Sequence, residues 1–454
     1  MQQRNYDAVV IGSGVGGMCA GALLVHEGYK TLVVESRDRL GGRFSTEEVE
    51  GFKLVTGASL IHHSGWVPRV FKKVGATLEL RDCFEVSYWI RGDEHYIPMG
   101  NRVAALFDLI NKMEVDRVRL VGGIAKEVAT QKIQGALGRA ISQPDKESGP
   151  TFREWLLRYT DNEDVHAVFD SMCVSFLLAH SYEIPARSFF HFMATEKGAG
   201  DGALCPQGNL SAVQELARVV ETNGDTWTDC PAKRIVVAKG AATGVVVEHT
   251  GREVEIACKA VISNAGPRQT VALAGSENFD AGYLAQMRVK LRASPVVIIH
   301  VASDEPLCLE GGEHGGMLVA GARRITGAIP LTNTCPELAP PGKHLLHLVA
   351  TPATTLAAMD AEEEIRQCTL DLEMIFPDFQ KKNGRILKME PRNIDHDLPL
   401  GRTWNGPPFR MPRETPVKNL WNVGDAAYSA FGGTSGCAET AMAVVEAVKQ
   451  SVGH

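Results

Sequence analysis

The stretch Ala8-Val9-Val10-Ile11-Gly12-Ser13-Gly14-Val15-Gly16-Gly17, near the start of the chain, decides the fold. Its first four residues form an apolar run suited to a buried parallel strand, and the glycines follow directly. The Ala/Leu-rich residues beyond them predict a helix to about His26, and Thr31–Val34 supplies a second strand. A strand, a Gly-rich turn, a helix and a strand in this order make a dinucleotide-binding βαβ unit. In such a unit the N–H groups at the helix start can receive a pyrophosphate.

Glu35 lies at the end of the second strand, 23 positions after Gly12. An acid at this place can accept hydrogen bonds from ribose hydroxyls. A G-x-G-x-x-G pattern alone often occurs by chance, but the strands, the helix and the acid together favour a nucleotide site over a purely structural turn. No other such pattern follows a strand, so a second resident dinucleotide is not expected.

The residues after this acid are Ser36-Arg37-Asp38-Arg39-Leu40-Gly41-Gly42-Arg43. They resemble the signature of the flavoprotein family that contains amine oxidases, protoporphyrinogen oxidase and phytoene desaturases, in which R-x-G-G-R follows the acid. Gly41 and Gly42 let the backbone pass close to the cofactor, and Arg43 can reach its phosphates. The resemblance implies that the dinucleotide is FAD, held noncovalently.

Further segments resemble the same family in the right order. Gly57 and Ala58 end a strand that passes near the flavin, although Val55 stands where an acid is usual. Pro206 to Leu210 resembles a P-x-G-G-M/L turn, from which Asn209 departs. Lys233-Arg234-Ile235 and Val261 to Pro267 resemble the strand that meets adenine and the V-x-S-N-A-x-P motif.

The last resemblance lies near the end of the chain. In the family, the acid of a G-D pair, here Gly424-Asp425, binds a ribityl hydroxyl, and a later turn and helix start, here from Gly433, lie against the flavin pyrimidine ring. Asp425 as a simple helix cap is the alternative. The resemblance therefore implies these cofactor-binding residues: Gly12, Gly14, Val15, Gly16, Gly17, Glu35, Ser36, Arg37, Gly41, Gly42, Arg43, Gly57, Ala58, Arg234, Ile235, Asn264, Gly424, Asp425, Gly433, Thr434 and Ser435.

Nucleotide-type segments alternate with others along the chain, which predicts two discontinuous domains. The expected fold is α/β: a Rossmann-like, GR2-type FAD-binding domain of residues 1–75, 205–285 and 390–454, with an inserted α+β substrate-binding domain of residues 76–204 and 286–389. Residues 75–204 are expected to be mainly helical.

Composition limits the partners and the compartment. The net charge of -7 comes without a block of basic residues, so no nucleic-acid partner is expected. Ten cysteines stand without C-x-x-C pairs or Cys/His spacing for zinc, which predicts reduced thiols and no metal site. The first strand begins by Tyr6 or Asp7, and no run of about 18 apolar residues occurs. We therefore expect a cytoplasmic protein, with peripheral membrane contact left open and the oligomeric state unassigned.

The motif spacing and the terminal Gly-Asp pair resemble the phytoene desaturase branch more closely than the amine oxidases. This implies an oxidoreductase that removes or reversibly transfers hydride at a C–C bond of an isoprenoid- or polyene-like substrate, with oxygen, a quinone or another molecule as electron acceptor. An amine oxidase, a redox-neutral flavin isomerase and a GDI-like lipid-binding protein without redox chemistry are the alternatives.

Catalytic side chains are harder to assign from the sequence, because a flavin can take a hydride without a protein acid or base. His62 and His63 follow the flavin-proximal strand, while Tyr428 and Phe431 lie between the ribityl acid and the terminal Gly turn. We expect His62, His63 and Tyr428 to face the substrate, although a structural role is common for any one histidine. Cys437, near the predicted helix start, is either a thiol of lowered pKa or a small buried residue.

Overall fold

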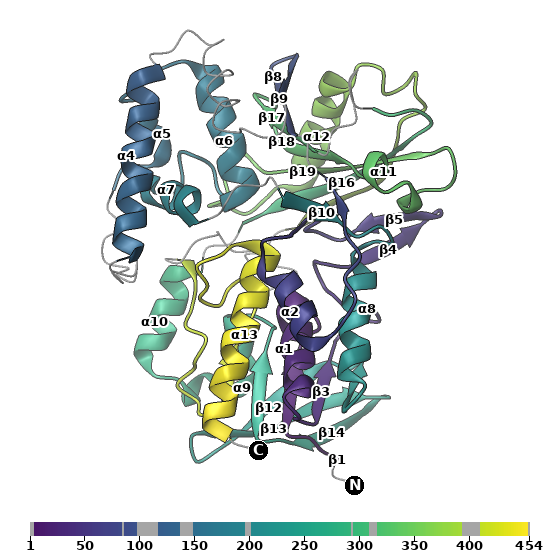
Figure 1. Cartoon of the computed structure of the whole chain (residues 1–454), viewed down its shortest axis with the longest axis vertical. Helices are drawn as coiled ribbons and strands as arrows, with labels where there is room; N and C mark the ends of the chain where they lie inside the picture. Colours follow the sequence, from purple (N-terminus) through teal and green to yellow (C-terminus); the bar gives the residue numbers. More distant parts are fainter. Residues whose placement is uncertain are drawn as a thin grey trace.

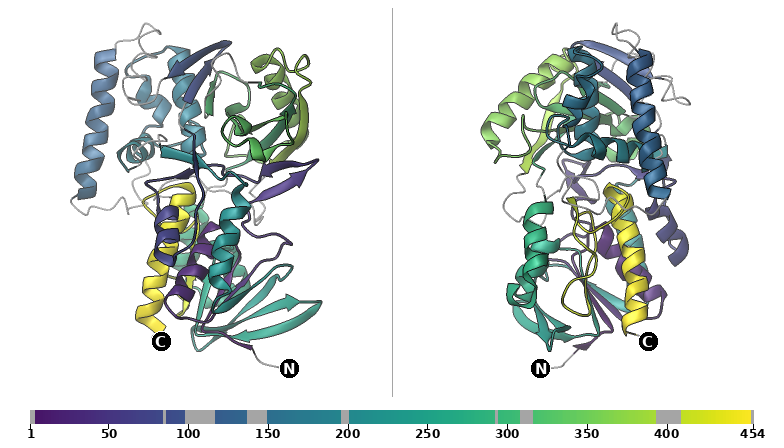
Figure 2. Two further views of the ribbon diagram at one scale, coloured as in Figure 1. Left: turned by 45° about the vertical axis from the view of Figure 1, so that its right-hand side comes forward. Right: turned by 90° about the vertical axis from the view of Figure 1, so that its left-hand side faces the viewer.

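The computed structural model describes residues 4–83, 86–97, 117–136, 149–195, 201–291, 294–307, 316–392 and 409–452. The described elements form two lobes stacked along the long axis, and both chain ends lie at the far end of the lower lobe (Figures 1 and 2). Within the described residues, no helix combines the length and apolarity needed to span a bilayer.

A five-stranded parallel sheet forms the centre of the lower lobe, in the strand order β11-β3-β2-β15-β21. Its strands are buried and short, because the apolar runs that form them are bounded by glycine or polar residues. In chain order they are β2 (Ala8–Ile11), β3 (Thr31–Val34), β11 (Gly224–Trp227), β15 (Ala260–Ser263) and β21 (Leu420–Asn422). All five come from residues 1–75, 205–285 and 390–454, the ranges expected to bind FAD.

The two faces of this sheet are covered differently. Alternate side chains of β2 point to opposite faces, so Ala8 and Val10 pack against helices while Val9 and Ile11 pack against a second, mainly antiparallel sheet. The helices are α1 (Val15–His26), α2 (Trp66–Val74), α8 (Asn209–Val220) and α13 (Gly433–Val452). The second sheet contains β1 (Arg4–Asn5), β12 (Ala232–Ala238), β13 (Ala241–His249) and β14 (Arg252–Ala257), with α9 (Pro267–Ala274) and α10 (Ala281–Lys290) nearby.

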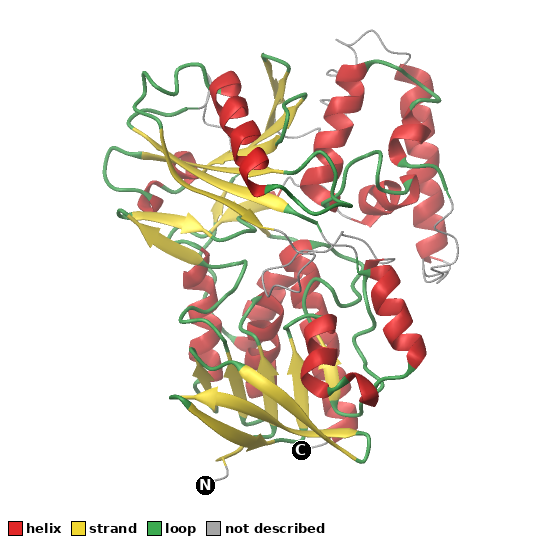
Figure 3. Cartoon of the chain, turned by 180° about the vertical axis from the view of Figure 1, so that it is seen from behind, coloured by secondary structure: helices red, strands yellow, loops and turns green. Residues whose placement is uncertain are grey.

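A seven-stranded mixed sheet, in the order β20-β16-β19-β18-β17-β8-β9, forms one half of the upper lobe. A group of helices stands beside it (Figure 3). The strands are β8 (Val86–Ile90), β9 (Asp93–Ile97), β16 (Val296–Ser303), β17 (Gly316–Ala320), β18 (Ile325–Pro330), β19 (His344–Ala350) and β20 (Arg385–Arg392). The helices of the upper lobe are α4 (Arg117–Ala136), α5 (Phe152–Leu156), α6 (Glu163–Leu177), α7 (Ala186–Thr195), α11 (Leu331–Thr334) and α12 (Ala361–Ile375).

The expectation of mainly helical structure over residues 75–204 misses part of this sheet. β8 pairs in parallel with β17, more than 200 residues later in the chain, and such distant pairing leaves little trace in the local sequence pattern. The expected helical range also includes residues 98–116, which lie outside the described residues, so that part stays a prediction.

Small β elements connect the two lobes. The hairpin of β4 (Thr46–Val49) and β5 (Phe52–Val55) reaches the upper sheet, and a three-stranded sheet is formed by β6 (Ile61–His62), β10 (Gly202–Leu204) and β7 (Arg81–Asp82). Lys388 of β20 forms an ion pair with Glu47 of β4 at 2.8 Å. Arg392 donates a 2.6 Å hydrogen bond to the carbonyl of Thr56. These contacts hold the seven-stranded sheet over the end of β5; we call it the substrate sheet, because its strands come mainly from the ranges expected to bind substrate.

Candidate active site

The Gly-rich turn is packed so closely that side chains are excluded from it. Gly12 has φ +92°, which favours glycine, and a Cβ on Gly17 would overlap the carbonyl oxygen of Gly12. A Cβ on Gly16 would lie 2.8 Å from the backbone nitrogen of Gly424. Helix α1 starts after Gly14 with no side chain capping its N–H groups. The turn therefore fits a pyrophosphate, which can accept hydrogen bonds from those N–H groups.

Glu35 is fixed at the end of β3 by four hydrogen bonds. Oε2 accepts from the backbone nitrogen of Ser13 at 2.9 Å and from its hydroxyl at 2.6 Å. Oε1 accepts from Arg37 N at 3.0 Å and from the Ser36 hydroxyl at 3.2 Å. The carboxylate is thus held rigidly beside the Gly-rich turn, in the position that a ribose needs.

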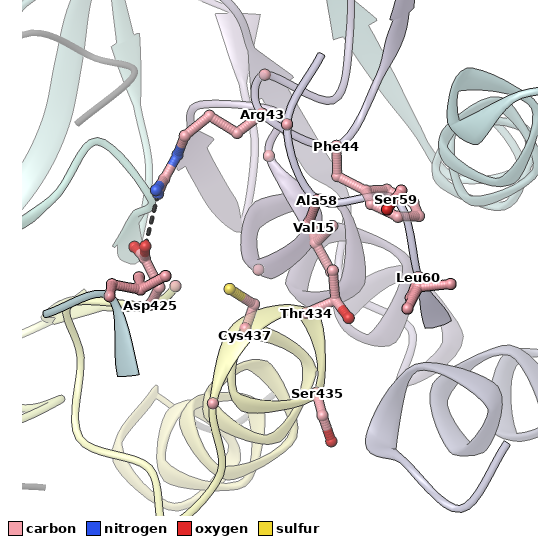
Figure 4. A pocket seen from close by; sticks show the side chains of 18 of the residues that line it. Val15, Arg43, Phe44, Ala58, Ser59, Leu60, Asp425, Thr434, Ser435 and Cys437 are labelled. Carbon is pink, nitrogen blue, oxygen red and sulfur yellow. Dashed lines mark hydrogen bonds and ion pairs between the residues drawn. The ribbon is translucent and has the colours of Figure 1, made fainter. Parts of the chain in front are cut away.

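Arg43 and Asp425 meet across the same cavity, 2.8 Å apart and 382 residues apart in the chain (Figure 4). The resemblance assigns them to a phosphate and to a ribityl hydroxyl, whereas the structure pairs them with each other. Both side chains are partly exposed, at 26% and 20%, so each can also contact a ligand in the cavity. The pair fits FAD because a guanidinium and a carboxylate offer a donor for phosphate and an acceptor for hydroxyl.

The start of α13 closes this end of the cavity. Thr434 and Ser435 line it, and the Ser435 hydroxyl accepts a 3.1 Å bond from the backbone nitrogen of Trp66. Cys437 is also in the wall (Figure 4), and burial, followed by the nearby Asp425, raises its pKa to about 12. The raised pKa favours a neutral thiol at Cys437 over a thiol of lowered pKa, although the side chain is half-buried rather than fully buried.

A single cavity of about 710 Å³ collects most of the predicted cofactor residues. Gly17, Arg234 and Ile235 do not line it; Gly17 packs against Gly12 instead. The wall next to the nucleotide end is formed by Pro231 and Ala232, which lie just before the segment expected to meet adenine. The predicted residues that do line it are Gly12, Gly14, Val15, Gly16, Glu35, Ser36, Arg37, Gly41, Gly42, Arg43, Gly57, Ala58, Asn264, Gly424, Asp425, Gly433, Thr434 and Ser435.

The three candidate catalytic residues are separated by the fold. His62 lines the cavity, and its Nδ1 lies 3.0 Å from an Asp201 oxygen. His63 points elsewhere, its Nε2 lying 2.6 Å from Asp82 with 45% of the side chain exposed. Tyr428 does not line the cavity, and the Arg413 guanidinium lies 6.0 Å from its ring centre. Among these three, only His62 is placed to face a substrate.

The upper part of the cavity lies in the upper lobe and is mainly apolar. Helices α6 and α7 and strands β16 to β19 supply its wall, with Val174, Phe176, Leu177, Phe192, Val296, Ile298, Met317, Leu318, Ile329 and Val349. Four histidine and arginine residues that the sequence did not single out also line it: His191, His347, Arg392 and Arg410. His191 and His347 are ionisable groups within mainly apolar elements, but that pattern does not tell which face of the helix or strand meets a cavity. Arg392 ends β20 and Arg410 lies in a loop, so no local pattern marks them.

Two of these groups illustrate the chemistry of the wall. Burial, and then the charge of Arg410, lower the pKa of His191 to about 4, so its imidazole is neutral at pH 7. Arg410 is 2% exposed and donates to the carbonyl of Ser429 at 2.7 Å and to that of Phe431. It thereby fixes the loop that leads into α13.

Removing the carboxylate of Asp425 tests the flavin end of the site. We expect Asp425→Ala to fold and to bind FAD about 10- to 100-fold more weakly, because one charged hydrogen-bond partner is lost and Arg43 keeps its charge without it. Glu35→Ala is the matching change at the adenosine end and should also deplete FAD. The flavin-to-protein absorbance ratio after gel filtration measures both. Normal FAD occupancy in both variants would contradict the assignment of these two acids.

Comparison with known proteins agrees with this site. The chain matches the family described as flavin containing amine oxidoreductase over residues 15–449. An uncharacterized protein of Methanocaldococcus jannaschii is 27% identical over 431 residues, 92% of this chain and 93% of that protein. An oxidoreductase of Methanosarcina mazei has a TM-score of 0.78 at 25% identity, covering 97% of this chain and 99% of the other.

A putrescine oxidase solved with putrescine shares the fold, with a TM-score of 0.73 at 15% identity over 99% of this chain and 100% of the other. The predicted α/β fold and the FAD cofactor are confirmed. The chain belongs to the flavin-containing amine oxidoreductase family and is an FAD-dependent oxidoreductase.

Proposed function

We propose that this enzyme removes, or reversibly transfers, hydrogen at a C–C bond of a hydrophobic, isoprenoid- or polyene-like substrate. The observation that carries the proposal is the charge pattern of the cavity. Among the described residues of the upper wall, histidine and arginine supply the basic groups, and no carboxylate is present. A long apolar molecule can bury its surface there without leaving a carboxylate unpaired.

The same pattern does not favour a protonated amine. The two acids that line the described cavity, Glu35 and Asp425, both lie in the cofactor part and already have partners. An ammonium group entering the upper part would meet Arg392 and Arg410 and find no carboxylate among the described lining residues. Desolvating a cation beside two other cations is unfavourable.

Bound FAD supplies the acceptor for a hydride. The chain's own contribution is to orient a C–H bond toward the cofactor and to keep water from the reacting carbons. The apolar wall from α6, α7 and the substrate sheet suits both tasks, because these elements are rigid and packed on buried cores. A separate electron acceptor, which we infer to be oxygen, a quinone or a similar molecule, must complete the cycle.

Anaerobic mixing tests the proposal directly. The purified holoenzyme is mixed with phytoene, geranylgeraniol or retinol in detergent, and in parallel with putrescine and benzylamine, while the visible flavin absorbance is followed. We expect at least one isoprenoid to bleach the flavin and the amines to leave it oxidised. Bleaching and peroxide release by amines alone would contradict the proposal, whereas an isoprenoid product with unchanged hydrogen content would indicate isomerisation.

A pair of variants at Val349, which lines the upper cavity, links the result to the wall. Val349→Asp places a carboxylate among apolar side chains, and Val349→Thr keeps the shape with a smaller polar change. We expect both variants to retain FAD. The rate of flavin bleaching by the isoprenoid should fall at least 10-fold further in the aspartate variant than in the threonine variant, because burying a charge costs far more free energy than burying a hydroxyl.

A further inference from the structure

Two histidines face each other across neighbouring strands of the substrate sheet. His300 of β16 and His347 of β19 are direct partners in the antiparallel register, so their side chains lie on the same face. Nδ1 of His347 lies 3.1 Å from Nε2 of His300. His347 is only 1% exposed and His300 only 2%. A buried imidazole–imidazole hydrogen bond is the result.

This pair has one end in the cavity. His347 lines it, next to Val349 and Ile329 on the same sheet. The His347 ring uses its Nδ1 atom for the hydrogen bond to His300. Among the described residues, Nε2 of His347 has no hydrogen-bond partner, so this atom is available to a molecule in the cavity. If Nδ1 carries the proton of that bond, Nε2 is an acceptor.

The other end of the pair leads toward the gap between the lobes. His300 is paired in register with Lys388 on β20, and Lys388 binds Glu47, whose side chain is 31% exposed. Nδ1 of His300 is buried and makes no hydrogen bond of normal geometry within the described residues, although the Val55 backbone acts on it as a weak acceptor. The pair therefore runs from the cavity wall to a point where the charges of Lys388 and Glu47 act on His300.

The surroundings keep both rings uncharged. Burial is the main cause of the low pKa of His300, about 4; the Val55 backbone and Glu47 oppose it, and Lys388 and Arg392 add to it. Burial, then His300 and Arg392, hold the pKa of His347 well below its usual value. A neutral imidazole can accept a proton at pH 7, and a second imidazole can share the charge.

We propose that His347 is the proton acceptor of the dehydrogenation and that His300 takes over the charge through their hydrogen bond. The inference rests on the proposed function. When a C–C single bond becomes a double bond, one carbon loses a hydride, which goes to FAD, and its neighbour loses a proton. That proton binds Nε2 of His347, while the proton on Nδ1 moves to Nε2 of His300. The substrate is thereby oxidised by two electrons, which bound FAD would take up with the hydride.

The first experiment needs no substrate. NMR of the holoenzyme carrying nitrogen-labelled histidine reports which ring nitrogen is protonated, and the His347 signals are assigned by their loss in His347→Gln. We expect Nδ1 protonated and Nε2 bare in the wild type, and a redistribution of this tautomer in His300→Gln. A protonated Nε2 in the wild type would overturn the inference, and so would a His347 tautomer that His300→Gln leaves unchanged.

The second experiment measures single-turnover flavin reduction by phytoene under anaerobic conditions from about pH 3.5 to 9, because the low pKa of both histidines places the acidic fall in rate below about pH 5. His347→Gln should be at least about 100-fold slower, with unchanged FAD content, and should lose the fall in rate that the wild type shows at acidic pH. His300→Gln should shift the acidic limb and slow the reaction less. His344→Gln is the control, because His344 lies on the same strand but outside the cavity lining.

The two proposals fail in different ways. If His347→Gln keeps the wild-type rate and pH profile, the proton-acceptor role is wrong even though phytoene reduces the flavin. If phytoene, geranylgeraniol and retinol all fail to reduce the flavin of the wild-type enzyme, the proposed function is wrong. The NMR measurement of the His347 tautomer still tests, without substrate, whether Nε2 can accept a proton.

Discussion

Gly17→Ala is expected to abolish FAD binding. The added Cβ would overlap the carbonyl oxygen of Gly12 and come within 3.2 Å of the Asn264 side chain, so the turn and the start of α1 must move apart. Both the close approach of the backbone to the pyrophosphate and the direction of the helix N–H groups depend on this contact. We expect FAD affinity to fall more than about 100-fold, measured by flavin retention and by titration of the apoprotein.

Gly122→Ala is the control for this change. Gly122 lies in α4, and a Cβ there meets nothing within 4 Å. Alanine should favour the helix by about 1 kcal/mol and leave FAD untouched. If Gly17→Ala also retains FAD with normal affinity, the close packing of the turn does not determine cofactor binding. Circular dichroism separates the loss of FAD from a general failure to fold.

Phe152→Ala should be the most damaging single change in the substrate domain. Phe152 is fully buried, and its ring stacks on Phe189 with centroids 4.0 Å apart and meets Phe169 edge-on at 5.5 Å. It therefore joins α5 to both α6 and α7, the helices that line the cavity. Removing a buried phenylalanine ring costs about 3–5 kcal/mol, because both apolar burial and packing are lost.

Thermal and denaturant unfolding, followed by tryptophan fluorescence, measure this loss. Leu157→Ala, at a residue 51% exposed in the next turn of chain, should change stability by less than about 0.5 kcal/mol. At temperatures where the Phe152→Ala protein is folded, we expect FAD content to stay normal, because the aromatic cluster lies in the other lobe. A stability change below about 1 kcal/mol would show that the three helices do not depend on this ring.

Local sequence order predicted the nucleotide half of the enzyme well. β2, the Gly-rich turn, α1, β3 and Glu35 follow one another within 28 residues, and the steric and hydrogen-bonding demands of the turn act over that short distance. The distant cofactor segments, Asn264 and Asp425, were found through resemblance to a family. The structure places both in the same cavity, although no local pattern links them.

The cavity-lining residues of the upper lobe could not be predicted from local sequence order. His300 and His347 become neighbours only because β16 pairs with β19, a contact that spans 47 residues. Which face of those strands meets the cavity depends on the packing of the sheet above β5. In the same way, His63 and Tyr428 are close in sequence to cavity residues, yet neither lines the cavity.

The sequence by itself determined the nucleotide-binding unit and, through the family signature, the FAD cofactor, because glycine sterics and strand–turn–helix order are local properties. The tertiary structure alone decided the pairing of Arg43 with Asp425, the apolar wall with basic groups, and the buried pair of histidines. Each of these joins residues from separate elements, and their distances are set by sheet pairing and lobe packing rather than by spacing along the chain.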